Sequence, residues 1–264
     1  MRALTVGLSL AGGVILLFGG GTLTLKEATA GTAPLHVAAA ADLMGVLPPL
    51  VRQFEQISKI PVRLSWGSTG EESLSIRHGA PYDFFMAADS RTPASLARDG
   101  FLVKQSLRIY ARGALVLFLR EKALREGTLS PSESALESPS VKRFAIPNPR
   151  LAPYGRSALA CLKKRGLWPG LRKKAVFGSS LAQVGQYVRS GSVDAAFLSL
   201  SLSMNLKKSG IKGATIHLVP GCASSLDQTM GIVTRSKHRQ AAERLEEFLS
   251  SPAAKKYLLA NGYH

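Results

Sequence analysis

Short apolar stretches alternate with amphipathic stretches along most of this chain, and that alternation limits the fold more than any other feature of the sequence. The first block predicts strands at 35–41, 61–66 and 83–88, with helices from about Pro48, at 70–78 and at 92–98. The pattern returns later, with strands at 144–146, 175–178 and 193–198 and helices at 157–165, 181–189 and 202–208. Such alternation is typical of an α/β fold whose mostly parallel sheets carry helices on both faces.

A long extended run at 106–119 separates the two blocks, and this spacing predicts two lobes. We expect lobe 1 to comprise 31–112 plus 222–264, and lobe 2 to comprise 113–221. Late strands at 215–219 and 230–234 and closing helices at 238–249 and 253–260 complete the pattern, whereas 126–140, rich in Ser, Pro and Glu, predicts a surface loop. Ligands of such folds bind where strands turn into helices, and a cleft between lobes presents those turns from both sides.

The N-terminal segment has the pattern of a secretory signal peptide. Residues 1–25 carry one charge, Arg2, an apolar stretch fills 3–21, and the small-residue triplet Ala28-Thr29-Ala30 predicts cleavage after residue 30. The alternative is an uncleaved membrane anchor, since the apolar stretch is nearly long enough to span a bilayer. Export permits a disulfide between Cys161 and Cys222. Their spacing of 61 residues leaves the bonded and free states equally open.

The charge balance indicates an anionic partner but does not identify it. The chain has 34 Lys and Arg against 17 Asp and Glu, a net charge of +17. Its basic residues are spread along the sequence and are not interleaved with aromatic residues, so we expect no nucleic-acid partner. Two cysteines exclude a four-cysteine zinc site. A hydrolase that uses Ser68 with His78 or Asp42 is disfavoured because the G-x-S-x-G elbow is missing.

Small polar residues follow four of the expected strands. They occur in Ala41-Asp42, in the Gly67–Gly70 turn GSTG, in the 148–155 turn NPRLAPYG and at 179–184. Hydroxyl groups and the free N–H groups of a helix start are donors that suit an anion. The alternative for Ser68 and Thr69 is an ordinary helix N-cap.

Longer stretches around these turns resemble one family. They are GAPYDFFMAAD at 79–89, FAIPNPRLAPYG at 144–155, VGQYVRSGSVDAAFLSLS at 184–201 and SSPAAKKYLLANGY near the end. From 35 to 263 the chain resembles the periplasmic molybdate-binding proteins, the substrate-binding components of ABC transporters. The resemblance implies a two-lobed, type II periplasmic-binding-protein-like fold that closes at crossings near 110–119 and 221–229. It also implies a monomeric non-enzyme that binds molybdate and tungstate, needs no cofactor and delivers its ligand to an inner-membrane permease.

The same resemblance implies an oxyanion site made of neutral donors, with no residue that binds a metal ion directly. Its members are Ala41, Asp42, Ser68, Thr69, Tyr154, Val184 through its backbone N–H, and Ser199. The family commonly has Ser, or Asn after Thr, where this chain has Asp42. A carboxylate ~4 Å from a dianion costs about 4 kcal/mol per charge pair at an effective dielectric constant of about 20.

Two interpretations of Asp42 follow from this departure. In the preferred one, its side chain turns away, caps its helix and leaves only the backbone N–H for the ligand. In the other, the pocket serves a different oxyanion, such as phosphate or sulfate, or an anion that is bound partly protonated.

Overall fold

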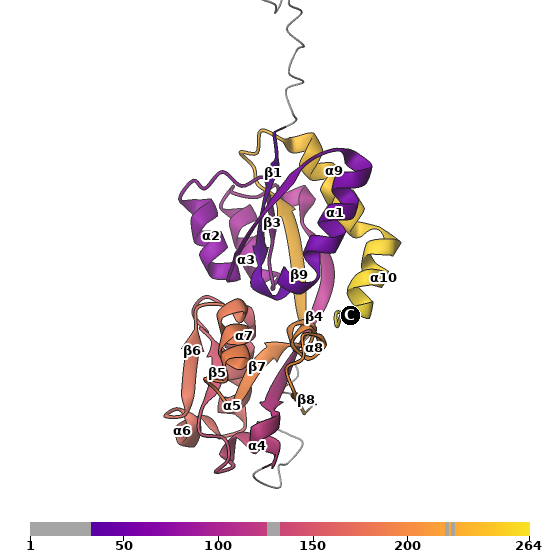
Figure 1. Cartoon of the computed structure of the whole chain (residues 1–264). Coiled ribbons are helices and arrows are strands. Elements are labelled where there is room, and N and C mark those ends of the chain that lie inside the picture. Colours follow the sequence, from indigo (N-terminus) through magenta and orange to yellow (C-terminus); the bar gives the residue numbers. More distant parts are fainter. Residues whose placement is uncertain (1–32, 126–132, 220–221, 223–224) are drawn as a thin grey trace, which may run out of the picture. The chain divides into compact units, whose positions relative to one another are not determined.

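Strand–helix alternation builds the first part of the chain in a computed structural model that describes residues 33–125, 133–219, 222 and 225–264 (Figure 1). The expected signal peptide, 1–30, lies outside the described residues. Within the described ranges, no helix is long and apolar enough to cross a membrane. The first elements are β1 (Leu35–Ala40), η1 (Ala41–Gly45), α1 (Leu47–Ser58), β2 (Val62–Gly67), α2 (Thr69–Arg77), β3 (Phe84–Met86), α3 (Arg91–Arg98) and η2 (Lys104–Ser106).

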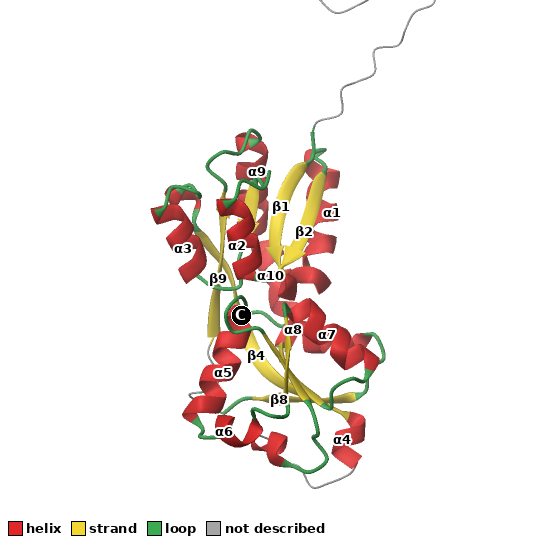
Figure 2. Ribbon diagram, turned by 90° about the vertical axis from the view of Figure 1, so that its left-hand side faces the viewer, coloured by secondary structure: helices red, strands yellow, loops and turns green. Residues whose placement is uncertain are grey.

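Helices cover both faces of the sheet that these strands form. Strand β1 pairs in parallel with β2 and β3, and β3 pairs antiparallel with β9 (Ser225–Ile232). Helices α1 and α9 (Arg239–Ser250) lie on one face and α2 and α3 on the other (Figure 1 and Figure 2). Alternate residues of β1 point to opposite faces. Accordingly, Leu35 and Val37 pack in the apolar cluster of α1 and α9, whereas Ala38 packs with Ile76 of α2 and Leu96 of α3.

Strand β4 (Arg108–Arg120) belongs to both halves of the fold. Its first part pairs antiparallel with β9, and its second part pairs antiparallel with β7 (Ala195–Ser199) and β8 (Gly213–His217). The sheet order is β2-β1-β3-β9-β4-β7-β5-β6, with β8 beside β4. The α/β class is therefore confirmed, but the sheet is mixed, because the strands at 108–120 and 225–232 run antiparallel to their neighbours.

The second block repeats the first arrangement around β5 (Phe144–Pro147), which pairs in parallel with β6 (Ala175–Gly178) and β7. Its helices are α4 (Glu121–Arg125), η3 (Glu133–Glu137), α5 (Pro153–Lys164), α6 (Trp168–Leu171), α7 (Leu181–Ser190) and α8 (Leu200–Lys208), and α10 (Pro252–Ala260) follows α9. A separate apolar cluster forms here, in which the rings of Phe144 and Phe197 meet edge to face with centroids 6.3 Å apart. Each fully buried side chain of this size contributes about 1.5–3 kcal/mol.

Several sequence expectations need correction. Helix α5 begins at Pro153, four residues before the expected start, because a proline at the first helical position loses no hydrogen bond. The described part of the expected surface loop at 126–140 contains a 3-10 turn, and Ala135 and Leu136 are buried. Strand β9 begins at Ser225, not at 230, since its pairing with β4 extends that far. The short helices α4 and α6 were not expected.

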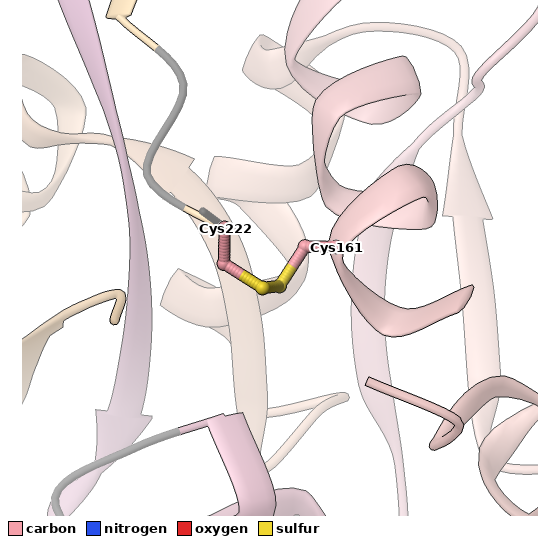
Figure 3. Close-up of a disulfide and its surroundings, with 2 residues drawn as sticks. All are labelled: Cys161 and Cys222. Atoms are coloured by element: carbon pink, nitrogen blue, oxygen red, sulfur yellow. A yellow bond between two sulfur atoms is a disulfide. The ribbon is translucent and has the colours of Figure 1, made fainter. Parts of the chain in front are cut away.

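The two cysteines form a disulfide, an outcome that the sequence left open. Cys161 lies on α5 and Cys222 precedes β9, and their Cα atoms are 4.6 Å apart (Figure 3). The bond therefore connects a helix of the second block to the segment that leads into the strand β9.

Candidate functional site

The ends of β1 and β2 and the starts of α5 and α7 meet around a small pocket. Its cavity volume is about 10 Å³, roughly the room that one water molecule needs. Its lining consists of Ala40, Ala41, Asp42, Ser68, Thr69, Ala88, Ala152, Pro153, Tyr154 and Leu181. Among the described residues, no Lys or Arg lines this pocket, and no group of His, Cys, Asp and Glu could hold a metal ion. The pocket thus brings together five of the seven expected site residues.

The turn from β2 into α2 supplies two hydroxyl groups with different partners. Ser68 is the N-cap of α2: its Oγ accepts from the backbone N–H of Glu71 at 3.3 Å and donates to the Glu71 carboxylate at 2.8 Å. Thr69 Oγ1 accepts from the backbone N–H of Ala88 at 3.0 Å. A hydroxyl that accepts in this way keeps its own hydrogen for donation. Ser68 therefore fits the cap interpretation, whereas Thr69 retains a donor beside the pocket.

Tyr154 comes to the pocket because α5 begins at Pro153. Its side chain is 1% exposed, and its hydroxyl accepts from Gln228 Nε2 at 3.0 Å and donates to Asp42 Oδ2 at 3.4 Å. Gly113 of β4 makes room for this hydroxyl, since a Cβ atom there would lie 2.0 Å from it. A larger residue at 113 would therefore displace the Tyr154 ring.

Asp42 does not cap its helix, and the preferred sequence interpretation is wrong on this point. Its Oδ2 accepts from Gln228 Nε2 at 2.7 Å and from Tyr263 Oη at 3.2 Å, in addition to Tyr154. Tyr263 also donates to the Asp42 carbonyl oxygen at 3.1 Å. These three donors come from distant parts of the chain, and together they hold the carboxyl of Asp42, a residue that is 2% exposed and lines the pocket.

A second layer fixes the donors of Asp42. The Tyr110 hydroxyl lies 2.7 Å from Gln228 Oε1 and 3.2 Å from the carbonyl oxygen of Ala87. Because Oε1 accepts from Tyr110, the amide nitrogen of Gln228 faces Asp42 and Tyr154. Tyr263 is placed by a bridge between its backbone and Gly113 of β4.

Burial controls the ionisation of this network. It raises the pKa of Asp42 from 3.8 to about 6, although the hydrogen bonds from Gln228, Tyr263 and Tyr154 act in the opposite direction. Burial, together with the charge of Asp42, raises the pKa of Tyr110, Tyr154 and Tyr263 well above the usual value for tyrosine. The three phenols are therefore neutral donors, and Asp42 is a carboxyl that gains a proton easily.

Two expected members lie outside the pocket lining. The backbone N–H of Val184 donates to the Ser180 carbonyl oxygen at 3.2 Å inside α7, and its side chain is fully buried. The residue of α7 that lines the pocket is Leu181. Ser199 is the N-cap of α8, where its Oγ accepts from the N–H of Leu202 at 3.1 Å. A ligand role for Val184 and Ser199 stays a prediction.

Sequence reasoning missed Gln228, Tyr110 and Tyr263. A signal for Gln228 exists: in β9 the core-facing positions alternate as Leu226, Gln228, Met230 and Ile232, so an amide occupies an apolar position. A buried polar side chain needs hydrogen-bond partners, which makes such a position a candidate for a site. Nothing local marks the two tyrosines.

Known proteins share this architecture. The profile of the bacterial extracellular solute-binding protein family matches residues 35–264. A molybdate-binding protein ModA of Azotobacter vinelandii is 33% identical over 240 residues, 90% of this chain and 93% of that protein. ModA of Rhodobacter capsulatus is 27% identical over 76% of this chain and 77% of that protein.

Solved structures lead to the same group. The periplasmic molybdate-binding protein of Azotobacter vinelandii has a TM-score of 0.78 and 28% identity, over 87% of this chain and 98% of that one. The match confirms the resemblance drawn from the 79–89 and 144–155 motifs. With its strand-end pocket of neutral donors, the chain belongs to the bacterial extracellular solute-binding proteins.

Proposed function

We propose that this protein captures molybdate, and also tungstate, in the periplasm and delivers it to the permease of an ABC transporter in the inner membrane. The observation that carries the proposal is the pocket, which is lined by Thr69, Tyr154 and the residues of helix starts and, among the described residues, by no Lys or Arg. Neutral donors can replace the water around a buried oxyanion. The similarity to ModA proteins supports molybdate as the anion.

The proposed site comprises Ala41, Asp42, Ser68, Thr69 and Tyr154, with Val184 and Ser199 as outer members. The helix starts matter because the first N–H groups of a helix have no partner within it and the helix dipole favours negative charge there. Helix α2 begins at Thr69 and α7 at Leu181, both beside the pocket. Helix α5 begins there at Pro153, which has no N–H, so Tyr154 carries its first backbone donor. Protein groups meet the oxygen atoms of the anion, and none binds its metal centre.

Ligand capture includes the closure of two lobes, 31–112 plus 222–264 and 113–221. One support is that each apolar cluster lies almost entirely within one of these two lobes. Another is that the paired strands β4 and β9 connect the two lobes. We place the hinge in these two strands. The proposed protein is a monomeric carrier without catalytic activity or cofactor, and residues 1–30 act as its export signal.

A thermal-shift series tests the ligand. Purified protein is melted with molybdate, tungstate, sulfate and phosphate in parallel. A ligand at about a thousand times its Kd stabilises by about 4 kcal/mol, which raises the Tm of a chain this long by about 8–16 °C. We expect this shift with molybdate and tungstate only.

The Tyr154→Phe variant removes one site hydroxyl, and Tyr257→Phe on α10, outside the pocket lining, is its matched control. We expect the first to reduce the shift and the second to leave it unchanged. A shift with phosphate or sulfate alone would contradict the proposal.

One observation favours a second candidate, a carrier for phosphate. Asp42 lines the pocket, and a carboxylate can accept a hydrogen bond from a protonated oxygen of the ligand. Hydrogen phosphate has such an oxygen, whereas molybdate at neutral pH does not. Competition between phosphate and labelled molybdate distinguishes the two.

A further inference from the structure

The Asp42 carboxyl has two oxygen atoms in different situations. Oδ2 accepts from Gln228, Tyr263 and Tyr154, at 2.7, 3.2 and 3.4 Å. Oδ1 is buried and has no hydrogen-bond partner among the described residues. Asp42 also lines the pocket. The donors of the protein thus occupy one oxygen and leave the other for a ligand or a proton.

An ionised Asp42 is unfavourable beside a bound dianion. At ~4 Å and an effective dielectric constant of about 20, one pair of like charges weakens binding about a thousandfold. Adding a proton to a carboxyl whose pKa lies about one unit below the working pH lowers the binding affinity only about tenfold. Protonation is therefore the less costly way to hold the anion in this pocket.

Resting on the molybdate-binding function, we propose that Asp42 binds the oxyanion in its protonated form, with the hydrogen on Oδ1 donated to an oxygen of the ligand. Each anion bound then takes up one proton from solution. The three donors to Oδ2 suit this state, because a protonated carboxyl still accepts at its second oxygen. The acid occupies the place of a neutral donor, and Asp42 becomes the residue that makes affinity depend on pH.

Among the described residues, no other charged side chain contributes to the pKa shift of Asp42, whose causes are burial and hydrogen bonds. The titratable groups that face it are Tyr110 of β4, Tyr154 of α5 and Tyr263 after α10, all neutral, and the Gln228 amide of β9 carries no charge. At the start of α2, Ser68 and Thr69 are uncharged.

Helices α7 and α8 also pack against η1, and their basic residues lie in the last turns, away from the helix starts. Within the described ranges, no Lys or Arg forms an ion pair with Asp42. The proton on Asp42 therefore responds to pH and to the bound anion.

The expected pH effect is large. With a pKa of about 6, the acid form is about one tenth of the free protein at pH 7. The apparent Kd equals the intrinsic value divided by that fraction. From pH 5 to pH 8, molybdate affinity should therefore fall about 90-fold, and at pH 8 about one proton should enter for each anion bound.

Isothermal titration of the purified protein with sodium molybdate tests this inference. Titrations at pH 5 and pH 8, each in two buffers with different ionisation enthalpies, give the Kd and the number of protons taken up. Asp42→Asn replaces the acid by a permanently neutral amide. It should bind at pH 8 about as tightly as the original protein does at pH 5, with no pH dependence and no proton uptake.

A second variant keeps the acid and moves its titration. The hydrogen bond from Tyr263 lowers the pKa of Asp42, so Tyr263→Phe should move the midpoint of the affinity profile to higher pH. The control variant Tyr257→Phe should leave the midpoint in place.

The outcomes separate the two proposals. A molybdate Kd that stays constant from pH 5 to pH 8 overturns the proton-linked role and leaves the carrier function intact. Phosphate binding that Asp42→Asn abolishes, with weaker molybdate binding, also overturns it, because Asp42 would then be an acceptor. If neither the original protein nor Asp42→Asn binds molybdate at pH 5, both the carrier function and the inference fail.

Discussion

Asp42→Asn should stabilise the ligand-free protein at neutral pH. The pKa of Asp42 is about 6 in the folded protein against 3.8 for an ordinary aspartate. A carboxyl with a raised pKa binds more protons in the folded state than in the unfolded state. Its ionised form therefore opposes folding, and the free energy of unfolding falls as pH rises from about 3.8 through about 6.

The magnitude follows from the two pKa values. A difference of about 2.2 units corresponds to about 3 kcal/mol at 25 °C. This contribution to the free energy of unfolding is present below about pH 3.8 and is lost by about pH 7. The amide of Asn does not ionise, so the variant should exceed the original protein by about 3 kcal/mol at pH 7.5 and by little at pH 3.5.

Urea unfolding at several pH values, with anion-free buffers and a constant ionic strength, measures the effect. The informative quantity is the difference in free energy between Asp42→Asn and the original protein, because other titrating groups cancel in it. Asp227→Asn is a control on an exposed carboxylate that pairs with Arg112 at the surface. A difference that does not change with pH, or an Asp42→Asn variant less stable at pH 7.5 than at pH 3.5 relative to the original, would refute the reasoning.

Two further predictions concern the donor turn and the disulfide. Thr69→Val keeps the shape of the side chain but removes the hydroxyl that lies beside Ala88, so it should weaken molybdate binding about tenfold, whereas Thr69→Ser should retain binding. Titration calorimetry measures both affinities, and equal values would mean that Thr69 contributes packing alone. Replacing both Cys161 and Cys222 by Ser removes a crosslink across 61 residues and should lower the free energy of unfolding in urea by about 4 kcal/mol. An unchanged free energy of unfolding would show that the unfolded chain is constrained without the disulfide.

The alternation of strands and helices was predictable because it depends on which side chains of each segment are buried. Each strand or helix of the two blocks places apolar side chains at the spacing its own geometry requires, as in Leu35–Ala40 and Leu47–Ser58. The strand-end turns were predictable for the same reason, and five expected site residues line one pocket. The start of α5 was less predictable, because a proline such as Pro153 can either end a turn or open a helix.

The network around Asp42 was not predictable, because it depends on contacts between distant segments. The residues that bind Asp42 are 112, 186 and 221 positions away in sequence. A local rule favoured a helix cap for this aspartate, and three side-chain donors outweigh it. The disulfide was undecidable for a similar reason, since only the path of the intervening chain brings Cys161 to Cys222.

The disulfide also has a positional consequence. Cys161 lies seven residues after Tyr154, two turns along the same side of α5, while Cys222 lies six residues before Gln228. Tyr154 and Gln228, the two residues near the ends of the disulfide, are hydrogen-bonded to each other at 3.0 Å beside Asp42. The covalent bond therefore shortens the chain path between two partners of one carboxyl, so that Tyr154 and Gln228 stay tethered to each other even when the chain is unfolded.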